Sequence, residues 1–129
     1  MATVKITGDN IESIVNDGDI VFLDFWASWC GPCRAFAPTF EAASEKHPNI
    51  VFGKIDTQEQ QALAQMLQIR SIPTIMAFRD GIQLYSQPGA LPPDAFNALI
   101  AKVVELDMDE VRSKIEEAEH DSKAASADA

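Results

Sequence analysis

The chain has 129 residues, of which 47% are hydrophobic and 23% charged, and its formal net charge at pH 7 is −10. These values are typical of a single soluble domain with a real hydrophobic core, and the negative charge argues against nucleic acid or an anionic membrane surface as a partner. The longest apolar run, Ile20 to Ala27, contains Asp24 and is too short to span a bilayer. Residues 1–15 show no secretory signal, so we expect a cytoplasmic protein without membrane attachment.

The predicted elements alternate between strands and helices along the chain. Continuous or alternating apolar runs indicate strands, and apolar residues spaced three or four apart indicate helices. In chain order we expect a strand at 3–6, a helix at 11–15, a strand at 20–26, a helix at 33–46, a strand at 49–56, a helix at 58–68, strands at 74–78 and 82–86, and a helix that opens at residue 94. Asp80-Gly81 favours a tight antiparallel hairpin between the last two strands. This order predicts an α/β fold in which a central mixed sheet of about five strands is flanked by helices on both faces.

The segment after residue 106 differs from the rest of the chain. Asp107 is a candidate N-cap for a short helix that ends near His120. The apolar residues of this helix share one stripe: Met108, Val111, Ile115 and Ala118. The stripe belongs either to a solvated acidic helix or to a helix that docks on this domain or on a second protein. Residues 122–129 are small and polar, which predicts disorder. We therefore divide the chain into a domain at 1–106 and an acidic C-terminal extension at 107–129.

Both cysteines of the chain stand in one motif, Cys30-Gly31-Pro32-Cys33, directly after the predicted strand at 20–26. A C-x-x-C turn can close into a disulfide and reopen, and in a reducing compartment such a pair is more often catalytic than structural. Two thiolates also supply half of a tetrahedral zinc shell, but no further Cys or His cluster completes it within one chain. The sequence has no phosphate loop and no dinucleotide glycine pattern. The motif therefore predicts a dithiol/disulfide exchange site, with no metal and no cofactor.

Position along the predicted helix assigns the two thiols different roles. Cys30 precedes the helix, where unpaired N–H groups and the helix dipole favour a thiolate, so we expect it to be the nucleophile. Pro32 suits the first helical turn, where its missing N–H has no partner in any case. Cys33 lies one turn inward and is the expected resolving thiol, which must first lose a proton.

Asp24 is the candidate that accepts this proton. It interrupts an otherwise apolar strand, and burial there is expected to raise its pKa toward the working pH, as suits a general base. An acid at the edge of the sheet, hydrogen-bonded or solvated, is the alternative at this point. Pro38 is expected to kink the helix that follows the cysteines and so to shape the site.

The motif and the stretches around it resemble the thioredoxin family. The matching stretches follow the family's order and are Val21–Arg34, Pro38, Lys54–Asp56, Ile69–Thr74 and Gly89-Ala90. The Gly-Pro pair between the cysteines is similar to the reducing branch of this superfamily. The resemblance implies a thioredoxin fold and a monomeric protein-disulfide reductase. It also implies clients that contain disulfides and regeneration by an NADPH-dependent thioredoxin reductase. Arg34 and Leu67 are small departures from the family pattern, and the extension is the large one.

The resemblance also implies roles for residues outside the motif. It strengthens Asp24 as the base, with Lys54 either near this carboxyl group or exposed at the end of its strand. It implies a cis Ile72–Pro73 bond beside the cysteines, so that the Ile72 backbone can pair with an extended client segment. It also implies an apolar docking rim formed by Trp29, Ile72, Pro73, Gly89 and Ala90. The competing hypothesis is a binding module of the same fold that holds one partner through this rim and the extension.

Overall fold

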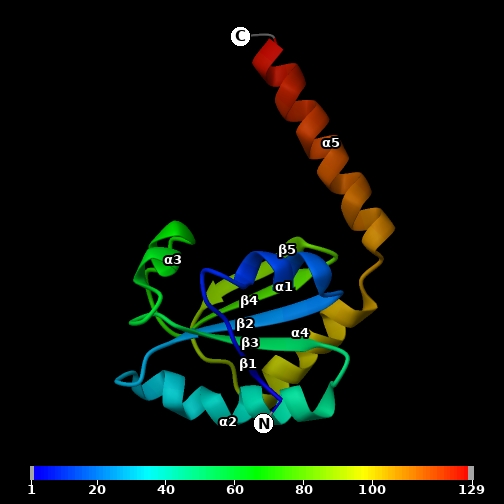
Figure 1. The fold of residues 1–129 in the computed structure, drawn as a ribbon. Helices are drawn as coiled ribbons and strands as arrows, with labels where there is room; N and C mark the ends of the chain where they lie inside the picture. Colours follow the sequence, from blue (N-terminus) through cyan, green and yellow to red (C-terminus); the bar gives the residue numbers. More distant parts are fainter. Residues whose placement is uncertain (1, 128–129) are drawn as a thin grey trace.

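The fold is that of a computed structural model, which describes residues 2–127 (Figure 1). In chain order its elements are β1 (Val4–Lys5), α1 (Ile11–Asp17), β2 (Ile20–Trp26), α2 (Gly31–Lys46), β3 (Val51–Asp56), α3 (Gln61–Met66), β4 (Thr74–Arg79), β5 (Ile82–Pro88), α4 (Pro93–Glu105) and α5 (Met108–Ala127).

The strands form one mixed sheet in the order β1-β3-β2-β4-β5. β3 runs parallel to β1 and β2, whereas β4 runs antiparallel to β2 and β5. β2 lies at the centre and is covered on both faces, which explains why its sequence is a nearly continuous apolar run. The predicted mixed sheet of five strands is confirmed.

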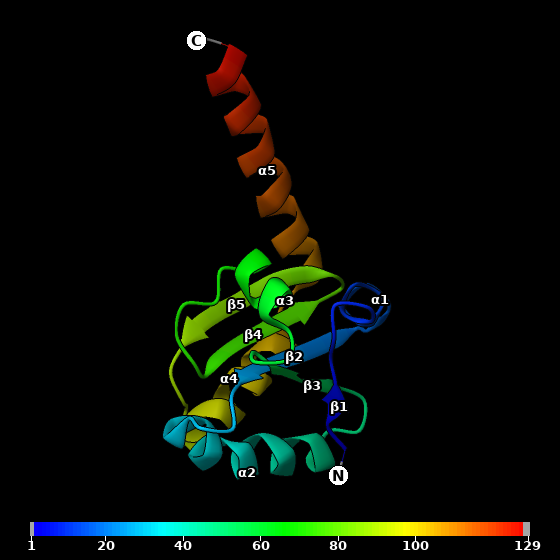
Figure 2. The same cartoon turned by 60° about the vertical axis from the view of Figure 1, so that its left-hand side comes forward.

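Helices cover the two faces of the sheet, and side-chain alternation along β2 decides which residue meets which face (Figures 1 and 2). Phe22 points to the side of α2 and α4, where it stacks on Phe52 and meets Phe96 edge-on. Leu23 points to the opposite side, where α1 and α3 pack. Asp24 therefore follows Phe22 onto the α2 face. This alternation places one carboxyl group beneath the helix that carries the cysteines.

Side-chain caps account for two boundaries that differ from the prediction. Asp56 Oδ1 accepts hydrogen bonds from the N–H groups of Gln58, at 2.9 Å, and Glu59, at 3.4 Å. These bonds hold a turn after β3, so the helix predicted from residue 58 begins only at Gln61. α2 begins at Gly31, two residues before the predicted start, because Cys30 takes the N-cap position.

The β4–β5 turn has the backbone that its sequence predicts. Asp80 and Gly81 both have positive φ, 54° and 78°, as a two-residue hairpin of type I′ requires. Arg79 Nη1, directly before the turn, donates to the carbonyl oxygens of Val103, Val104 and Leu106 at 2.8–3.0 Å. This side chain thus satisfies carbonyl groups at the end of α4.

α5 is joined to the domain at its base and projects away from it (Figures 1 and 2). Asp107 Oδ1 accepts from the N–H groups of Asp109, at 3.0 Å, and Glu110, at 3.2 Å, which confirms the predicted N-cap. Met108 is buried, and Arg112 pairs with Asp80 of the hairpin turn at 3.1 Å.

The outer part of α5 corrects one prediction about the extension. The helix continues to Ala127, so the predicted end near His120 is wrong. The disorder predicted for residues 122–129 stays a prediction, and residues 128 and 129 lie outside the described part. The apolar stripe contacts the domain mainly through Met108, because Ile115 is 37% exposed and Ala118 is exposed. None of the helices within residues 2–127 has both the length and the apolar character needed to cross a bilayer.

Candidate active site

The two cysteines lie at the start of α2, directly beyond the end of β2. Cys30 is the N-cap residue, and its Sγ accepts a hydrogen bond from the backbone N–H of Cys33 at 3.2 Å. Pro32 occupies the first turn, as predicted. The two sulfur atoms form a disulfide, with their Cα atoms 5.2 Å apart. After reduction, a thiolate at Cys30 would keep this N–H donor and the positive end of the helix dipole.

Burial alone does not separate the two thiols. Cys33 is 3% exposed, which agrees with the expectation of a shielded residue, but Cys30 is only 4% exposed. Their surroundings differ more than their burial. Trp29, directly before Cys30, is 65% exposed, and Cys30 Sγ lies 3.8 Å from the carbonyl oxygen of Ile72. The end of the disulfide that meets the surface is therefore the Cys30 end.

Two loops meet beside Cys30. The Ile72–Pro73 peptide bond is cis, as expected, and Pro73 directly precedes β4. The Pro73 carbonyl oxygen accepts a hydrogen bond from the N–H of Gly89 at 2.8 Å, which ties this loop to the residues that follow β5. Gly89 has a φ of +105°, a conformation that favours glycine.

The rim residues differ in how much surface they present. Trp29, Gly89 and Ala90 are exposed, and Ile72 is half-buried. Pro73 is buried, so it offers little surface for contact. The structure brings Ile72, Pro73 and Gly89 together with Cys30.

Asp24 is buried without a polar partner. It is 1% exposed, and neither of its carboxylate oxygens has a hydrogen-bond partner within the described residues. Burial raises the pKa of this carboxyl group to about 7, although the positive charge of Lys54 acts in the opposite direction. The alternative of a hydrogen-bonded or solvated acid at the sheet edge is therefore wrong, because β2 is the central strand and Asp24 is buried.

Lys54 lies opposite Asp24 in the β2–β3 register, but its ammonium group is directed elsewhere. Lys54 Nζ lies 3.9 Å from Glu41 Oε1 on α2 and 5.0 Å from the centre of the Trp26 ring. Trp26 packs against the cysteines, and its indole N–H is buried without a partner within the described residues. No local pattern in the sequence indicates Glu41, because its contact with Lys54 joins a residue on α2 to a lysine on β3.

Two further residues shape α2. Pro38 lies on the exposed side of the helix, which continues through it to Lys46. Arg34 Nη1 donates to the carbonyl oxygen of Ser28 at 3.0 Å and so connects the first turn of the helix to the loop before the disulfide. Gly31 and Pro32 are both exposed, so the dipeptide between the cysteines forms part of the surface.

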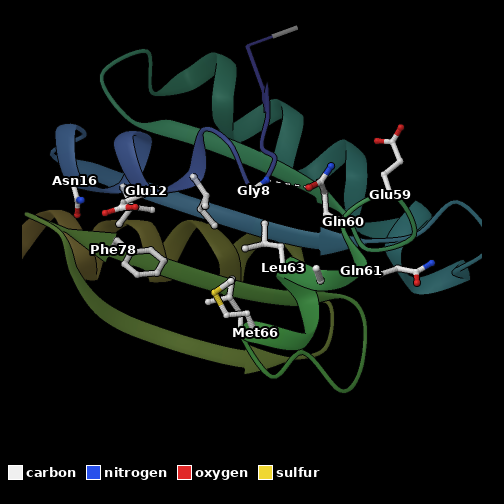
Figure 3. Close-up of a pocket in the computed structure, with 13 residues that line it drawn as sticks. Gly8, Glu12, Asn16, Glu59, Gln60, Gln61, Leu63, Met66 and Phe78 are labelled. Atoms are coloured by element: carbon white, nitrogen blue, oxygen red, sulfur yellow. Dashed lines mark hydrogen bonds between the residues drawn. The ribbon is translucent and has the colours of Figure 1, made fainter.

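An apolar cavity of about 490 Å³ lies on the opposite face of the sheet, between α1 and α3 (Figure 3). Its lining includes the apolar residues Leu63, Met66 and Phe78 and the acidic residues Glu12 and Glu59. Neither cysteine borders it. The disulfide thus lies away from this cavity.

Comparisons with known proteins agree with this geometry. The thioredoxin family model matches residues 2–102. The chain is 47% identical over 116 residues to a putative thioredoxin 2 from Streptomyces coelicolor, a match that covers 90% of this chain and 87% of the relative. It is 40% identical over 96 residues to a thioredoxin from Coprinus comatus, covering 73% of this chain and 90% of the relative.

A solved structure gives the same result for the fold. A mutant thioredoxin from Halobacterium salinarum matches with a TM-score of 0.75 at 35% identity, over 81% of this chain and 93% of that one. The expected thioredoxin fold is confirmed. Because the family model matches most of this chain, the chain belongs to the thioredoxin family.

Proposed function

We propose that Cys30 is the attacking thiol, and Cys33 the resolving thiol, of this protein-disulfide reductase. Membership in the thioredoxin family makes the chain a thiol-disulfide oxidoreductase whose clients are proteins with disulfides. The observation that supports the two roles is the hydrogen bond from Cys33 N–H to Cys30 Sγ at the start of α2. It favours negative charge on Cys30 rather than on Cys33.

The proposed reaction has two exchange steps. The Cys30 thiolate attacks one sulfur of the client disulfide, which forms a mixed disulfide and releases the other client sulfur as a thiolate. Cys33, once deprotonated, attacks Cys30 Sγ and releases the second client thiol. The client gains two electrons, and the chain is left with the Cys30–Cys33 disulfide.

Asp24 is the proposed acceptor of the Cys33 proton. It lies on the α2 face of β2, between Phe22, which packs in the core beneath α2, and Trp26, which contacts the cysteines. Its pKa of about 7 is suited to accepting and returning a proton near neutral pH. Lys54 tunes this carboxyl group by its charge.

Clients are proposed to bind at the rim defined above. The Ile72 backbone pairs with an extended client segment, while Trp29 and Ala90 contact its side chains. An NADPH-dependent thioredoxin reductase is the proposed electron donor, and we propose that the chain acts as a monomer in the cytoplasm. The cysteine pair supports this location, because the disulfides of cytosolic proteins are usually transient and catalytic.

Reduction of insulin disulfides tests these roles. Dithiothreitol, and then NADPH with thioredoxin reductase, would supply electrons to the unmodified chain, to Cys30→Ser and to Cys33→Ser. We expect both variants to lose turnover, and Cys33→Ser alone to accumulate a mixed disulfide with the client. Accumulation by Cys30→Ser instead would reverse the assignment.

The alternative is a thioredoxin-fold module dedicated to one partner through the rim and α5. The exposed stripe of α5 around Ile115 is the observation in its favour. In that case partner binding would be independent of the redox state of Cys30 and Cys33, and insulin would not be reduced. Binding that requires the reduced cysteines would support the reductase.

A further inference from the structure

The buried Asp24 and the neighbouring Lys54 do not form an ion pair. Asp24 and Lys54 are register partners on β2 and β3, and both follow a phenylalanine onto the α2 face of the sheet. A lysine in this position would ordinarily pair with the carboxylate, since an unpaired buried charge is costly. Nevertheless, both oxygens of Asp24 lack a hydrogen-bond partner within the described residues.

Two groups account for the position of the ammonium. Lys54 Nζ lies 3.9 Å from Glu41 Oε1, in a pair whose side chains are only 21% and 33% exposed. It also lies 5.0 Å from the centre of the Trp26 ring, within the range of a cation–π contact. Partial burial reduces solvent screening, so these contacts are stronger than those of a fully exposed ion pair.

We propose that Glu41 is a positioning residue of the reductase: together with Trp26 it holds the Lys54 ammonium away from Asp24, and so keeps that carboxyl group able to take a proton from Cys33. This inference rests on the role proposed above for Asp24. It assigns Glu41 no contact with the client or with the reacting sulfur atoms.

Few other charged groups surround this arrangement. On β4 the register partner of Asp24 is the apolar Ile75. From α2, Glu41 lies beside Lys54, and the two cysteines pack against Trp26. A second cavity is lined by Trp26 and Lys54 together with Lys5, Asp56 and Glu59. Lys5 Nζ lies 3.1 Å from Glu59 Oε2 and is thus already paired. Among the described residues, Lys54 is therefore the charged group that acts on Asp24, and Glu41 is the partner of Lys54.

The effect of Glu41→Gln has a definite sign. Removal of one negative charge and release of the ammonium toward Asp24 both favour the ionised carboxylate. We expect the pKa of Asp24 to fall by about 0.5 or more, and the acidic limb of the pH profile for insulin reduction to move to lower pH with it. Glu45→Gln is the matched control, because Glu45 is an exposed carboxylate one turn further along α2. It should leave both readouts unchanged.

The experiment is a carbon-13 NMR titration of the Asp24 carboxyl group in the full chain, with thermal unfolding to verify that each variant folds. The same comparison is repeated in a Lys54→Met background. If Glu41 acts by positioning Lys54, Glu41→Gln shifts the Asp24 titration much less in that background. Equal shifts in both backgrounds, or no shift in either, would overturn the inference.

The titration also separates this inference from the proposed reaction. It reports on Asp24 directly, whether or not this group is the base for Cys33. If Asp24→Asn leaves insulin reduction unchanged, the proposed role of Asp24 fails, whatever the NMR result. If Asp24→Asn slows reduction but Glu41→Gln leaves the Asp24 titration unchanged, only the role of Glu41 fails.

Discussion

Gly89 donates its backbone N–H to the carbonyl oxygen of Pro73 at 2.8 Å, so the loop after β5 and the loop before β4 form one unit beside Cys30. The φ of Gly89 is +105°, while no atom lies within 4 Å of the place where a Cβ would stand. A side chain at this position would therefore meet backbone strain rather than a steric clash.

The first prediction concerns this glycine. Gly89→Ala should lower the free energy of unfolding by about 1–3 kcal/mol, because alanine rarely adopts this φ. It should also raise KM for insulin, because the loop that forms part of the rim shifts. Urea unfolding and steady-state kinetics measure the two effects. Gly8→Ala is the control: Gly8 has no strained φ, and the nearest atom to an added Cβ is 3.9 Å away. A Gly89→Ala variant as stable as this control would contradict the prediction.

The second prediction is that Asp24 makes stability depend on pH. The pKa of this carboxyl group is about 7 in the folded chain, against an ordinary value of 3.8. Between these values the folded state binds more protons than the unfolded state, so stability falls as pH rises through this range. The loss is at most about 4 kcal/mol above pH 7.

Asp24→Asn should remove this pH dependence. We expect the variant to be more stable than the unmodified chain at pH 8 and equally stable near pH 4, while it reduces insulin more slowly. Urea unfolding at several pH values measures the difference. A constant difference across this range would show that Asp24 does not titrate as described.

The third prediction concerns Trp29. Its side chain is 65% exposed, so Trp29→Ala should change the melting temperature little. Loss of the apolar ring at the rim should nevertheless raise KM for insulin and leave kcat nearly unchanged, since the ring binds the client without taking part in the exchange. Unchanged KM would remove Trp29 from the docking rim.

The fourth prediction separates the base of α5 from its outer part. Met108 is 6% exposed, whereas Ile115 is 37% exposed. Met108→Ala should therefore cost about 2 kcal/mol or more of stability, and Ile115→Ala should cost little. Thermal unfolding of the two variants gives the comparison. Equal destabilisation would mean that the stripe docks on the domain along its whole length.

Local sequence was sufficient where one short segment determines the outcome. The bounds of β2 follow from its continuous apolar run, and the hairpin follows from Asp80-Gly81. The prediction failed where a side chain competes with the backbone pattern, as Asp56 does before α3. It also places the end of α5 too early, because alanine favours helices and the helix continues beyond its apolar stripe to Ala127.

The features of the site also fall into those that local sequence predicts and those that it does not. The roles proposed for Cys30 and Cys33 depend on a local motif and a helix start, which sequence alone predicts. The cis bond before Pro73 came only from the family resemblance, because base rates favour trans. The contact between Glu41 and Lys54 depends on how α2 lies across β3, and no pattern in either segment contains that information.

The adjacent residues Arg79 and Asp80 hold two different helices, since Arg79 caps α4 and Asp80 binds Arg112 of α5. They stand at the far end of β4 from Pro73, and a six-residue strand is about 20 Å long. The exposed stripe of α5 thus starts from the end of the sheet that is remote from the disulfide. A protein that bound this helix would therefore leave the rim at the other end of the sheet free for clients.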